Sequence, residues 1–525
     1  MSLDLLVLGS GVAGLSAAVR GAELHGLRVG VLTKGDLDQA TTRWAQGGVA
    51  AVLGGADPDS TDLHLADTLA AGAGLCDADA VRVLVDEGPA RVNELIALGA
   101  RFDRDELGEL ELAREGGHSQ ARIVHAGGAA TGVEVERALV DAVRKRAVAL
   151  HEGWFALDLL VSNGRCTGVV ALDEHGTRVE IASRHVLLAT GGAGQLFAVT
   201  TNPSEATGDG VAMALRAGIA VADVEFVQFH PTALHHPAMP RPLLSEALRG
   251  HGALLRGRGG ERFVEELLPR DQVSRAIVAQ MAREGTDHVW LDATGLERFG
   301  ERFPTIASEL RAIGLDPATD WLPISPAAHY SCGGVVADLD GATALPGLWA
   351  AGEVACNGVM GANRLASNSL LDGMVFGPRV VEAVAGGKDG PDATGAMRAV
   401  LNGAATSDGV IGGRRLGGDA PVTVVDPSNA AVEPDTARKH LQERMFRDAG
   451  VLRSADSLDQ AREALDEIGA GLSGDDAAAW EIRNLVTVGT ALVSAARARE
   501  ESRGAHARTD FPDLDEAFHL RLVIG

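Results

Sequence analysis

Cysteine and long apolar runs are scarce in this sequence of 525 residues. The four cysteines, Cys76, Cys166, Cys332 and Cys356, have neither CxxC spacing nor the clustering of metal ligands, so no disulfide framework is expected and the thiols should be reduced and buried. No apolar stretch is long enough to span a bilayer. The N-terminus also lacks the basic segment that opens a secretory signal peptide. These absences predict a soluble, cytoplasmic protein without membrane contact.

Positive charge is also scarce. The chain carries 47 basic and 72 acidic side chains, which gives a formal net charge of -25. This excess of negative charge argues against nucleic acid and anionic membranes as partners. An anionic substrate would therefore need a local cluster of cations. A chain of this length is expected to divide into two or three domains.

The most informative local pattern opens the chain. An apolar strand over 3–8 runs into a GxGxxG turn, and a helix over 11–25 and a second strand over 28–32 follow. In such a unit the first glycine permits the tight turn, the second lets the backbone approach a pyrophosphate, and the third allows close helix-on-strand packing. The helix N-terminus then faces the anion. The glycines in question are Gly9, Gly11 and Gly14.

Later segments extend this pattern toward an FAD site. A polar loop spans 40–48, a strand over 179–189 ends in a glycine turn at 190–192, and a helix begins at 207–210. After a long insertion, another strand runs into the AGE sequence that ends at Glu353. In an open parallel sheet such turns gather at the carboxyl edge, where ligands bind. A ligandless strand-turn-helix is therefore the weaker alternative.

The end of the second strand distinguishes between dinucleotides. It stops at Thr33-Lys34, without the acidic residue that usually holds a ribose hydroxyl, which lowers the case for NAD. Lys34 could approach the adenosine or phosphate part of FAD. A solvated lysine is the alternative.

The composition and periodicity of successive segments predict an α/β protein with three kinds of domain. Residues 224–329 are rich in proline, histidine and arginine and have few long apolar runs, which suggests an inserted domain. Helical periodicity returns in 437–446 and 480–499. The predicted division is a Rossmann-like FAD-binding domain (1–223 and 330–400), an α+β capping domain (224–329), a linker (401–434) and a C-terminal helical bundle (435–525).

Five short segments carry side chains suited to a molecule with two carboxylates. Arginine's planar fork matches a carboxylate, and imidazole and hydroxyl groups add donors. Each residue has a plain structural alternative: a core histidine, a surface ion pair for an arginine followed by aspartate, and a helix N-cap for the serine. Only the set as a whole favours function. Its members are His230, Ser245, Arg270, His329 and Arg364.

The order of motifs along the chain is specific. GxGxxG, TxWAQGG, REGGH, ATGG, QFHPT, SEALRG, PRD, HYxCGG, AGE and NRLASNSLL follow one another. In this respect the chain resembles the succinate dehydrogenase and fumarate reductase flavoprotein family over nearly its full length, and within it the L-aspartate oxidases. The resemblance implies oxidation of L-aspartate to iminoaspartate, with the flavin reoxidised by oxygen, giving hydrogen peroxide, or by fumarate, giving succinate. It also implies the first step of NAD biosynthesis and handover to quinolinate synthase.

The resemblance assigns roles by position. His230, Ser245, His329 and Arg364 would bind the substrate carboxylates, and Arg270 would transfer a proton. Further substrate contacts would come from Gln228, Glu246 and Ser367. The FAD contacts would be Gly9, Ser10, Gly11, Ala13, Gly14, Lys34, Thr41, Thr42, Ala45, Gln46, Gly47, Gly48, Ala156, Gly191, Asp209, Glu353, Ser369 and Leu370.

Two positions favour the aspartate branch. The respiratory enzymes carry a histidine bonded covalently to the flavin in the loop before AQGG, and the corresponding residue here is Thr41, which implies noncovalent FAD. Glu115, in the REGGH motif, supplies a carboxylate that the succinate enzymes lack, and it could pair with the ammonium of aspartate. A solvated glutamate in a polar loop is the alternative.

Two positions depart from the family pattern. Ser245 stands where threonine is frequent, and it keeps the hydroxyl. His251 replaces a second glutamate, so any role transferred from that glutamate is in doubt. His235 and His236 have no partners at the sequence spacing of metal ligands, so no metal is predicted.

Two other functions compete with the oxidase. A fumarate reductase or succinate dehydrogenase flavoprotein subunit would have covalent flavin and iron-sulfur partners, and Thr41 and Glu115 argue against it. A flavoprotein that serves only as a binding or assembly subunit would leave the cationic set unexplained.

Overall fold

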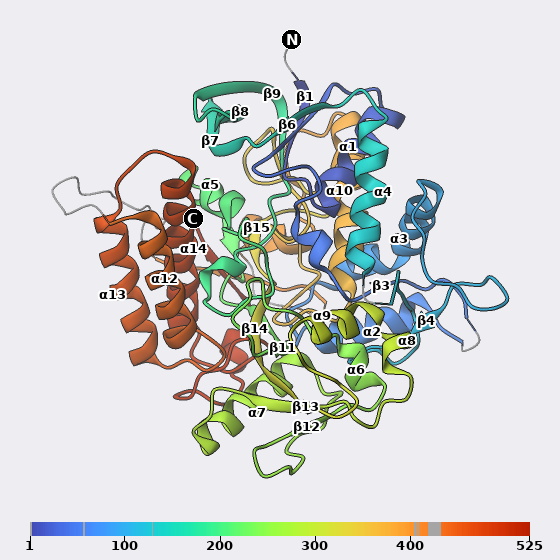
Figure 1. The fold of residues 1–525 in the computed structure, drawn as a ribbon. Coiled ribbons are helices and arrows are strands. Elements are labelled where there is room, and N and C mark those ends of the chain that lie inside the picture. Colours follow the sequence, from blue (N-terminus) through green and yellow to red (C-terminus); the bar gives the residue numbers. More distant parts are fainter. Residues whose placement is uncertain (1–2, 56–57, 129, 404–406, 408, 418–431) are drawn as a thin grey trace.

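The computed structural model of the protein describes residues 3–55, 58–128, 130–403, 407, 409–417 and 432–525 (Figure 1). Its framework is a parallel sheet whose strands pair in the order β6 (Ala149–Glu152), β2 (Val29–Thr33), β1 (Leu3–Leu8), β9 (Arg178–Leu188) and β16 (Leu348–Ala350). The antiparallel strands β8 (Arg165–Leu172) and β7 (Phe155–Ser162) extend from the first half of β9. The predicted opening unit is confirmed, with helix α1 at Val12–Leu24.

Helices pack on this sheet through apolar faces. Leu5, Val7 and Phe376 are fully or almost fully buried in the core beneath them, and each such side chain contributes about 1.5–3 kcal/mol when removed from water. A Cβ at Gly377 would overlap the backbone of Ala13, so glycine allows α1 and α10 to cross closely. The helices of this layer are α1, α4 (Thr131–Arg144) and α10 (Asn368–Ala385), while α3 (Ala78–Ala97) packs on α10 and α2 (Thr61–Ala71) packs on α3.

The chain between the two parts of the FAD-binding domain forms an α+β unit with its own core. Its antiparallel sheet has the order β11 (Val227–Leu234), β14 (Leu322–Ser331), β13 (Val289–Asp292) and β12 (Leu254–Arg256). Leu234, Ile277 and Leu322 are buried in its core. It lies at the bottom of Figure 1, in green and yellow. Its helices are α6 (Glu246–Gly250), α7 (Arg270–Glu284), α8 (Phe299–Arg302) and α9 (Pro304–Ala312).

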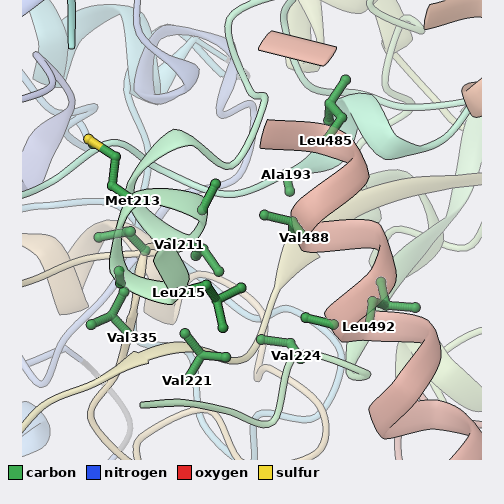
Figure 2. Close-up of a cluster of buried hydrophobic side chains, with 14 of the residues drawn as sticks. Ala193, Val211, Met213, Leu215, Val221, Val224, Val335, Leu485, Val488 and Leu492 are labelled. Atoms are coloured by element: carbon green, nitrogen blue, oxygen red, sulfur yellow. The ribbon is translucent and has the colours of Figure 1, made fainter. Parts of the chain in front are cut away.

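The C-terminal helices form a separate group, at the left of Figure 1. They are α12 (Pro434–Asp448), α13 (Ala455–Gly471) and α14 (Ala477–Ala498). Figure 2 shows α14 beside α5 (Asp209–Arg216), with Val488 pointing toward the side of α5 that carries Val211 and Leu215. This contact joins the helical group to the FAD-binding domain through a continuous apolar core.

The last residues of the chain differ from the prediction of helix over 435–525. Beyond Ala498 they contain only the short 3-10 helix η4 (Glu516–Phe518) and strand β19 (Arg521–Ile524). The apolar run of β19 inserts between β10 (Val221–Ala222) and β18 (Gly413–Arg415) in a small sheet that also contains β15 (Gly334–Val336) and β17 (Ala355–Cys356). Pairing with strands far away in sequence decides this structure, and helical periodicity cannot reveal it.

Few elements occur in the remaining connections. A three-stranded sheet has the order β3 (Val49–Ala50), β5 (Ile123–Val124) and β4 (Leu112–Ala113). The other short elements are α11 (Arg398–Leu401), η1 (Thr41–Trp44), η2 (Gly194–Leu196) and η3 (Gly395–Met397). Much of the predicted linker, 401–434, lies outside the described residues.

The four cysteines are buried and free of disulfides, as predicted. Within the described part of the chain, no helix has the length and apolar character needed to cross a membrane.

Candidate functional site

A large cleft lies where the carboxyl edge of the parallel sheet meets the inserted α+β unit. It encloses about 1590 Å³ of space, including open solvent at its mouth. Of the predicted cofactor residues all but Gly14 line this cleft, and of the predicted substrate residues all but Gln228 do. The structure therefore brings together residues that lie more than three hundred positions apart in sequence.

The β1–α1 turn forms one wall of the cleft. Gly9 has φ +109°, and a Cβ there would overlap the carbonyl oxygen of Ala189. Gly14 lies behind the cleft, where a Cβ would overlap the carbonyl oxygen of Gly9, so its role is helix-on-strand packing. The N-terminus of α1 opens into the cleft beside Thr42, whose Oγ1 accepts a 2.9 Å hydrogen bond from the Val12 N–H. Such a helix end attracts phosphate.

Lys34 enters the cleft from the end of β2 but is engaged by protein. Its Nζ lies 2.6 Å from Thr207 Oγ1, 3.0 Å from Asp209 Oδ2 and 2.6 Å from Glu481 Oε1. Burial opposes the charge, but the two carboxylates outweigh it and raise the pKa of Lys34. Lys34 is thus a partly buried, ion-paired cation rather than a solvated lysine. The sequence did not indicate that α14 supplies a partner at this end of the cleft.

Several polar groups in the cleft are suited to a dinucleotide. Gln46 Oε1 is buried and has no hydrogen-bond partner among the described residues. Glu353 is half-buried in the cleft lining, accepts a 2.9 Å hydrogen bond from the Ser331 N–H, and has its pKa raised to about 7 by desolvation. An unpartnered acceptor, a carboxyl group, a helix N-terminus and a long cleft together fit FAD. The chain would hold it through the turn at 9–13, the loop at 41–48 and Glu353.

Two guanidiniums lie side by side at the other end of the cleft. Gln228 Oε1 accepts hydrogen bonds from Arg270 Nη1 and Arg364 Nη2, each at 3.2 Å, and so fixes both cations from behind. Arg364 also donates to Ser369 Oγ at 2.8 Å and stacks on the Tyr330 ring, 4.7 Å from its centroid. Gln228 is thus placed to position the guanidiniums from outside the cleft lining.

The two arginines differ in their charge balance. Arg270 begins α7 and donates from Nε to Glu246 Oε2 at 2.7 Å. No carboxylate of the described residues lies within 4.0 Å of the Arg364 guanidinium. Burial, with Arg270 adding to it, lowers the pKa of Arg364 to about 10. Because a buried cation without an anionic partner is costly, Arg364 is poised to bind an anion.

Two neutral histidines face the same space. The rings of His230 and His329 are 5.2 Å apart, and burial together with the nearby arginines lowers the pKa of each well below its ordinary value. Nδ1 of His230 accepts a 3.3 Å hydrogen bond from the Thr232 N–H, so the neutral ring carries its proton on Nε2. Nδ1 of His329 contacts Thr201 Oγ1 at 2.7 Å. His230 is therefore set to donate, which suits a carboxylate ligand.

Glu115 is buried, which excludes the alternative of a solvated loop residue. Oε2 accepts a 2.6 Å hydrogen bond from Ser367 Oγ, and Oε1 lies 3.2 Å from His125 Nε2. Burial would raise its pKa, but His125 and Ser367 outweigh burial and lower the pKa to about 2. Ser367 has φ +61°, a left-handed conformation that is strained for serine and aims its hydroxyl at Glu115. The cleft thus holds an ionised carboxylate close to Arg270.

Ser245 and Glu246 have structural contacts as well as a place in the cleft. Ser245 is the N-cap of α6, with Oγ accepting a 3.3 Å hydrogen bond from the Ala247 N–H. Glu246 pairs with Arg270, and its pKa is lowered because the attraction of Arg270 and Arg249 outweighs burial. The carboxylate of Glu246 is therefore committed to the guanidiniums of Arg270 and Arg249.

Some contacts were not predicted. His125, Thr201 and Tyr330 all touch the site, although the sequence pattern assigned them no role. His125 follows Glu115 by ten residues, but no local motif marked it. His251 lies outside the cleft lining, where its Nδ1 is 2.8 Å from the Ala247 carbonyl and its ring contacts Phe303.

Comparison with known proteins agrees with this geometry. Residues 4–370 match the model of the FAD binding domain, and residues 438–523 match the fumarate reductase flavoprotein C-terminal model. The structure of E. coli quinol fumarate reductase has a TM-score of 0.84 at 29% identity, covering 99% of this chain and 93% of that chain. The Mycobacterium smegmatis Sdh1 complex in the apo form has a TM-score of 0.81 at 32% identity, covering 99% and 90%.

Curated relatives are similar over the whole chain. L-aspartate oxidase of Streptomyces coelicolor is 47% identical, covering 100% of this chain and 91% of its own length. The chloroplastic L-aspartate oxidase of Arabidopsis thaliana is 42% identical, covering 99% and 83%. The chain therefore belongs to the L-aspartate oxidase family of FAD-binding flavoproteins.

Proposed function

We propose that this protein oxidises L-aspartate to iminoaspartate with a noncovalently bound FAD. The observation that carries the proposal is the pairing, in one cleft, of a buried guanidinium without a carboxylate partner, Arg364, and a buried ionised carboxylate, Glu115. A ligand with two carboxylates and an ammonium group complements both charges. The curated relatives named L-aspartate oxidase support the same substrate.

The residues of the cleft would bind aspartate at three points. Arg364 would take one carboxylate in a charge-assisted hydrogen bond. The Nε2–H of His230, with His329 and the Ser245 hydroxyl, would bind the other, and Glu115 would pair with the ammonium. Three fixed points determine the orientation of a small molecule, so the Cα–H is held in one position for reaction.

FAD held in this cleft would supply the redox chemistry, as acceptor of the hydride from Cα of aspartate and as donor of the electrons to oxygen or fumarate. The substrate amino group loses a proton in the same overall reaction. The inserted α+β unit supplies His230, Ser245 and Arg270 to the substrate end, and it would help to exclude water there once substrate is bound. Arg270, bound to Glu246, holds a proton at its guanidinium and would deliver it in the fumarate-reducing direction.

The absence of a histidine in the loop over the cleft supports noncovalent FAD. Thr41, in η1, lines the cleft at the position where the respiratory relatives carry the covalently attached histidine. A threonine hydroxyl is not a comparable nucleophile toward the flavin ring. FAD is therefore expected to be released on denaturation.

The product places the enzyme in a reaction sequence. Iminoaspartate hydrolyses readily, so an enzyme that consumes it must follow closely. We assign this chain to the first step of NAD biosynthesis through quinolinate, with quinolinate synthase as the functional partner that receives the imine.

Anaerobic reduction of the flavin tests the proposal. L-Aspartate should bleach the FAD absorbance, whereas succinate, which lacks the ammonium, should not do so at a comparable rate. Addition of oxygen or fumarate should restore the colour. Bleaching by succinate with no response to L-aspartate would favour a succinate dehydrogenase or fumarate reductase instead, and acid-stable attachment of the flavin would refute the noncovalent site.

A further inference from the structure

Three side chains with metal-binding atoms meet on the inserted α+β unit, outside the cleft. His235 directly follows β11, while Asp287 and His288 directly precede β13. One ligand atom from each lies within 4.8 Å of the other two. They meet because Ile324 of β14 pairs with both Leu234 and Val289, their chain neighbours. The sequence predicted no metal here, since local spacing cannot show a meeting of distant segments.

The cluster is held in place by its own contacts. Asp287 Oδ1 lies 2.8 Å from His288 Nδ1, and Asp287 Oδ2 lies 3.6 Å from His235 Nε2. The two imidazole rings are stacked, with centroids 5.0 Å apart and an interplanar angle of 24°. Trp290 packs edge-on against His288 at 4.7 Å. The rings are thus oriented before any ligand arrives, which limits the cost of binding.

Two imidazoles and one carboxylate form a ligand set with a clear preference. Zn²⁺ and similar transition-metal ions take histidine nitrogen and carboxylate oxygen at about 2.0–2.2 Å, whereas Mg²⁺ and Ca²⁺ prefer oxygen alone. Arg241 is a nearby cation, and its charge weakens the attraction of the cluster for a metal ion. The side chains are partly exposed, so water can complete the coordination.

A second cluster of possible metal ligands differs from the histidine cluster, because a lysine lies at its centre. Asp338, Asp340 and Asp392 also meet within the same distance of one another. The Nζ of Lys388 lies 2.6–2.7 Å from an oxygen of each of them, so a protein cation already occupies the centre. No comparable cation occupies the histidine cluster among the described residues.

We propose that His235, Asp287 and His288 bind one divalent transition-metal ion of the Zn²⁺ class. Such an ion would join the end of β11 to the segment that follows α7. These two elements carry His230 and Arg270 of the substrate site. Binding would therefore stabilise the unit that covers the cleft, independently of which substrate the cleft takes.

Equilibrium dialysis of the FAD-loaded, tag-free protein against Zn²⁺ tests this site. The wild type should retain one ion per chain and unfold at a higher temperature with Zn²⁺ than without. Asp287→Asn and His288→Ala should each raise the dissociation constant by more than about tenfold and abolish the thermal shift. FAD content and the metal-free unfolding temperature show that the variants are folded.

Two histidines outside the cluster serve as matched controls. His236 neighbours His235, but its Nδ1 accepts a hydrogen bond from the Ala238 N–H, and His175 is an exposed histidine beside Glu174. His236→Ala and His175→Ala should bind Zn²⁺ like the wild type. Absence of Zn²⁺ from the wild type at large molar excess, unchanged binding in the cluster variants, or equal losses in the controls would each overturn the assignment.

Discussion

Replacing Glu115 by glutamine isolates the charge that distinguishes an amino acid from a plain dicarboxylate. The side chain is buried at 3% exposure and its pKa is lowered to about 2, so it is ionised throughout the working pH range. Glutamine has nearly the same size and keeps an acceptor for the 2.6 Å hydrogen bond from Ser367. The variant therefore removes the negative charge while the shape of the site is retained.

The size of the effect follows from the environment of this carboxylate. A hydrogen bond to a charged group contributes about 1.5–3 kcal/mol, and about 1.36 kcal/mol corresponds to a tenfold change. The kcat/KM for L-aspartate should therefore fall roughly 10- to 150-fold. Fumarate has no ammonium to lose a partner, so its rate of reduction should fall less than about threefold.

Stopped-flow spectroscopy measures both reactions on the same protein. L-Aspartate is mixed anaerobically with oxidised enzyme, and fumarate with enzyme that has been reduced chemically. Glu111→Gln serves as the control, because Glu111 is an exposed glutamate of the same segment and should leave both rates unchanged. Equal losses for the two ligands, or a wild-type response to aspartate, would refute the role of Glu115 in binding the ammonium.

Three further predictions rest on single contacts. Arg364→Leu should weaken fumarate more than about thirtyfold in a flavin difference titration while FAD stays bound, because it removes the buried cation that has no carboxylate partner. Gly9→Ala should abolish FAD retention after gel filtration, since a Cβ at φ +109° would overlap the Ala189 carbonyl. Glu136 is buried without a hydrogen-bond partner in the described chain, and burial raises its pKa above 4.5. Because the native state binds this proton more tightly than the unfolded state, wild-type stability falls as pH rises above 4.5. The unfolding temperature of Glu136→Gln relative to that of the wild type should therefore increase from about pH 5 to about pH 8.

Each of these has a contradicting result. Unchanged fumarate affinity in Arg364→Leu would remove the guanidinium from the substrate site. Normal FAD content in Gly9→Ala would show that the turn can relax. A constant difference in unfolding temperature across the pH range would mean that a cation or hydrogen-bond donor stabilises the ionised form of Glu136 in solution.

Local pattern was enough to predict the opening unit. The apolar strand, the glycine turn and the helix after it depend on neighbouring residues, and the structure places β1 and α1 within a residue or so of the predicted bounds. The 3.6-residue periodicity of 480–499 likewise predicted α14. By contrast, β19 was missed because three or four apolar residues become a strand only when β10 and β18 lie beside them.

The candidate site shows the same division. Motif order predicted that His230, Arg270, His329 and Arg364 would meet, and all four line one cleft. Their mutual arrangement could not be predicted, because it depends on contacts between distant segments. Gln228 was expected to contact substrate, but it lies behind the lining and is placed to align the guanidiniums through contacts that only the folded chain creates.

The charges of the cleft favour aspartate over fumarate by a simple balance. With both histidines neutral, Glu246 faces Arg270 in the cleft lining and Arg249 behind it, so Arg364 and Glu115 are the positive and negative groups left to face the ligand at this end of the cleft. Aspartate offers an anion to the first and a cation to the second, so its second carboxylate needs only neutral donors. Fumarate brings a second negative charge and nothing for Glu115. Removal of that carboxylate therefore acts against aspartate and leaves fumarate nearly unchanged, and this difference separates amine recognition from a general weakening of the site.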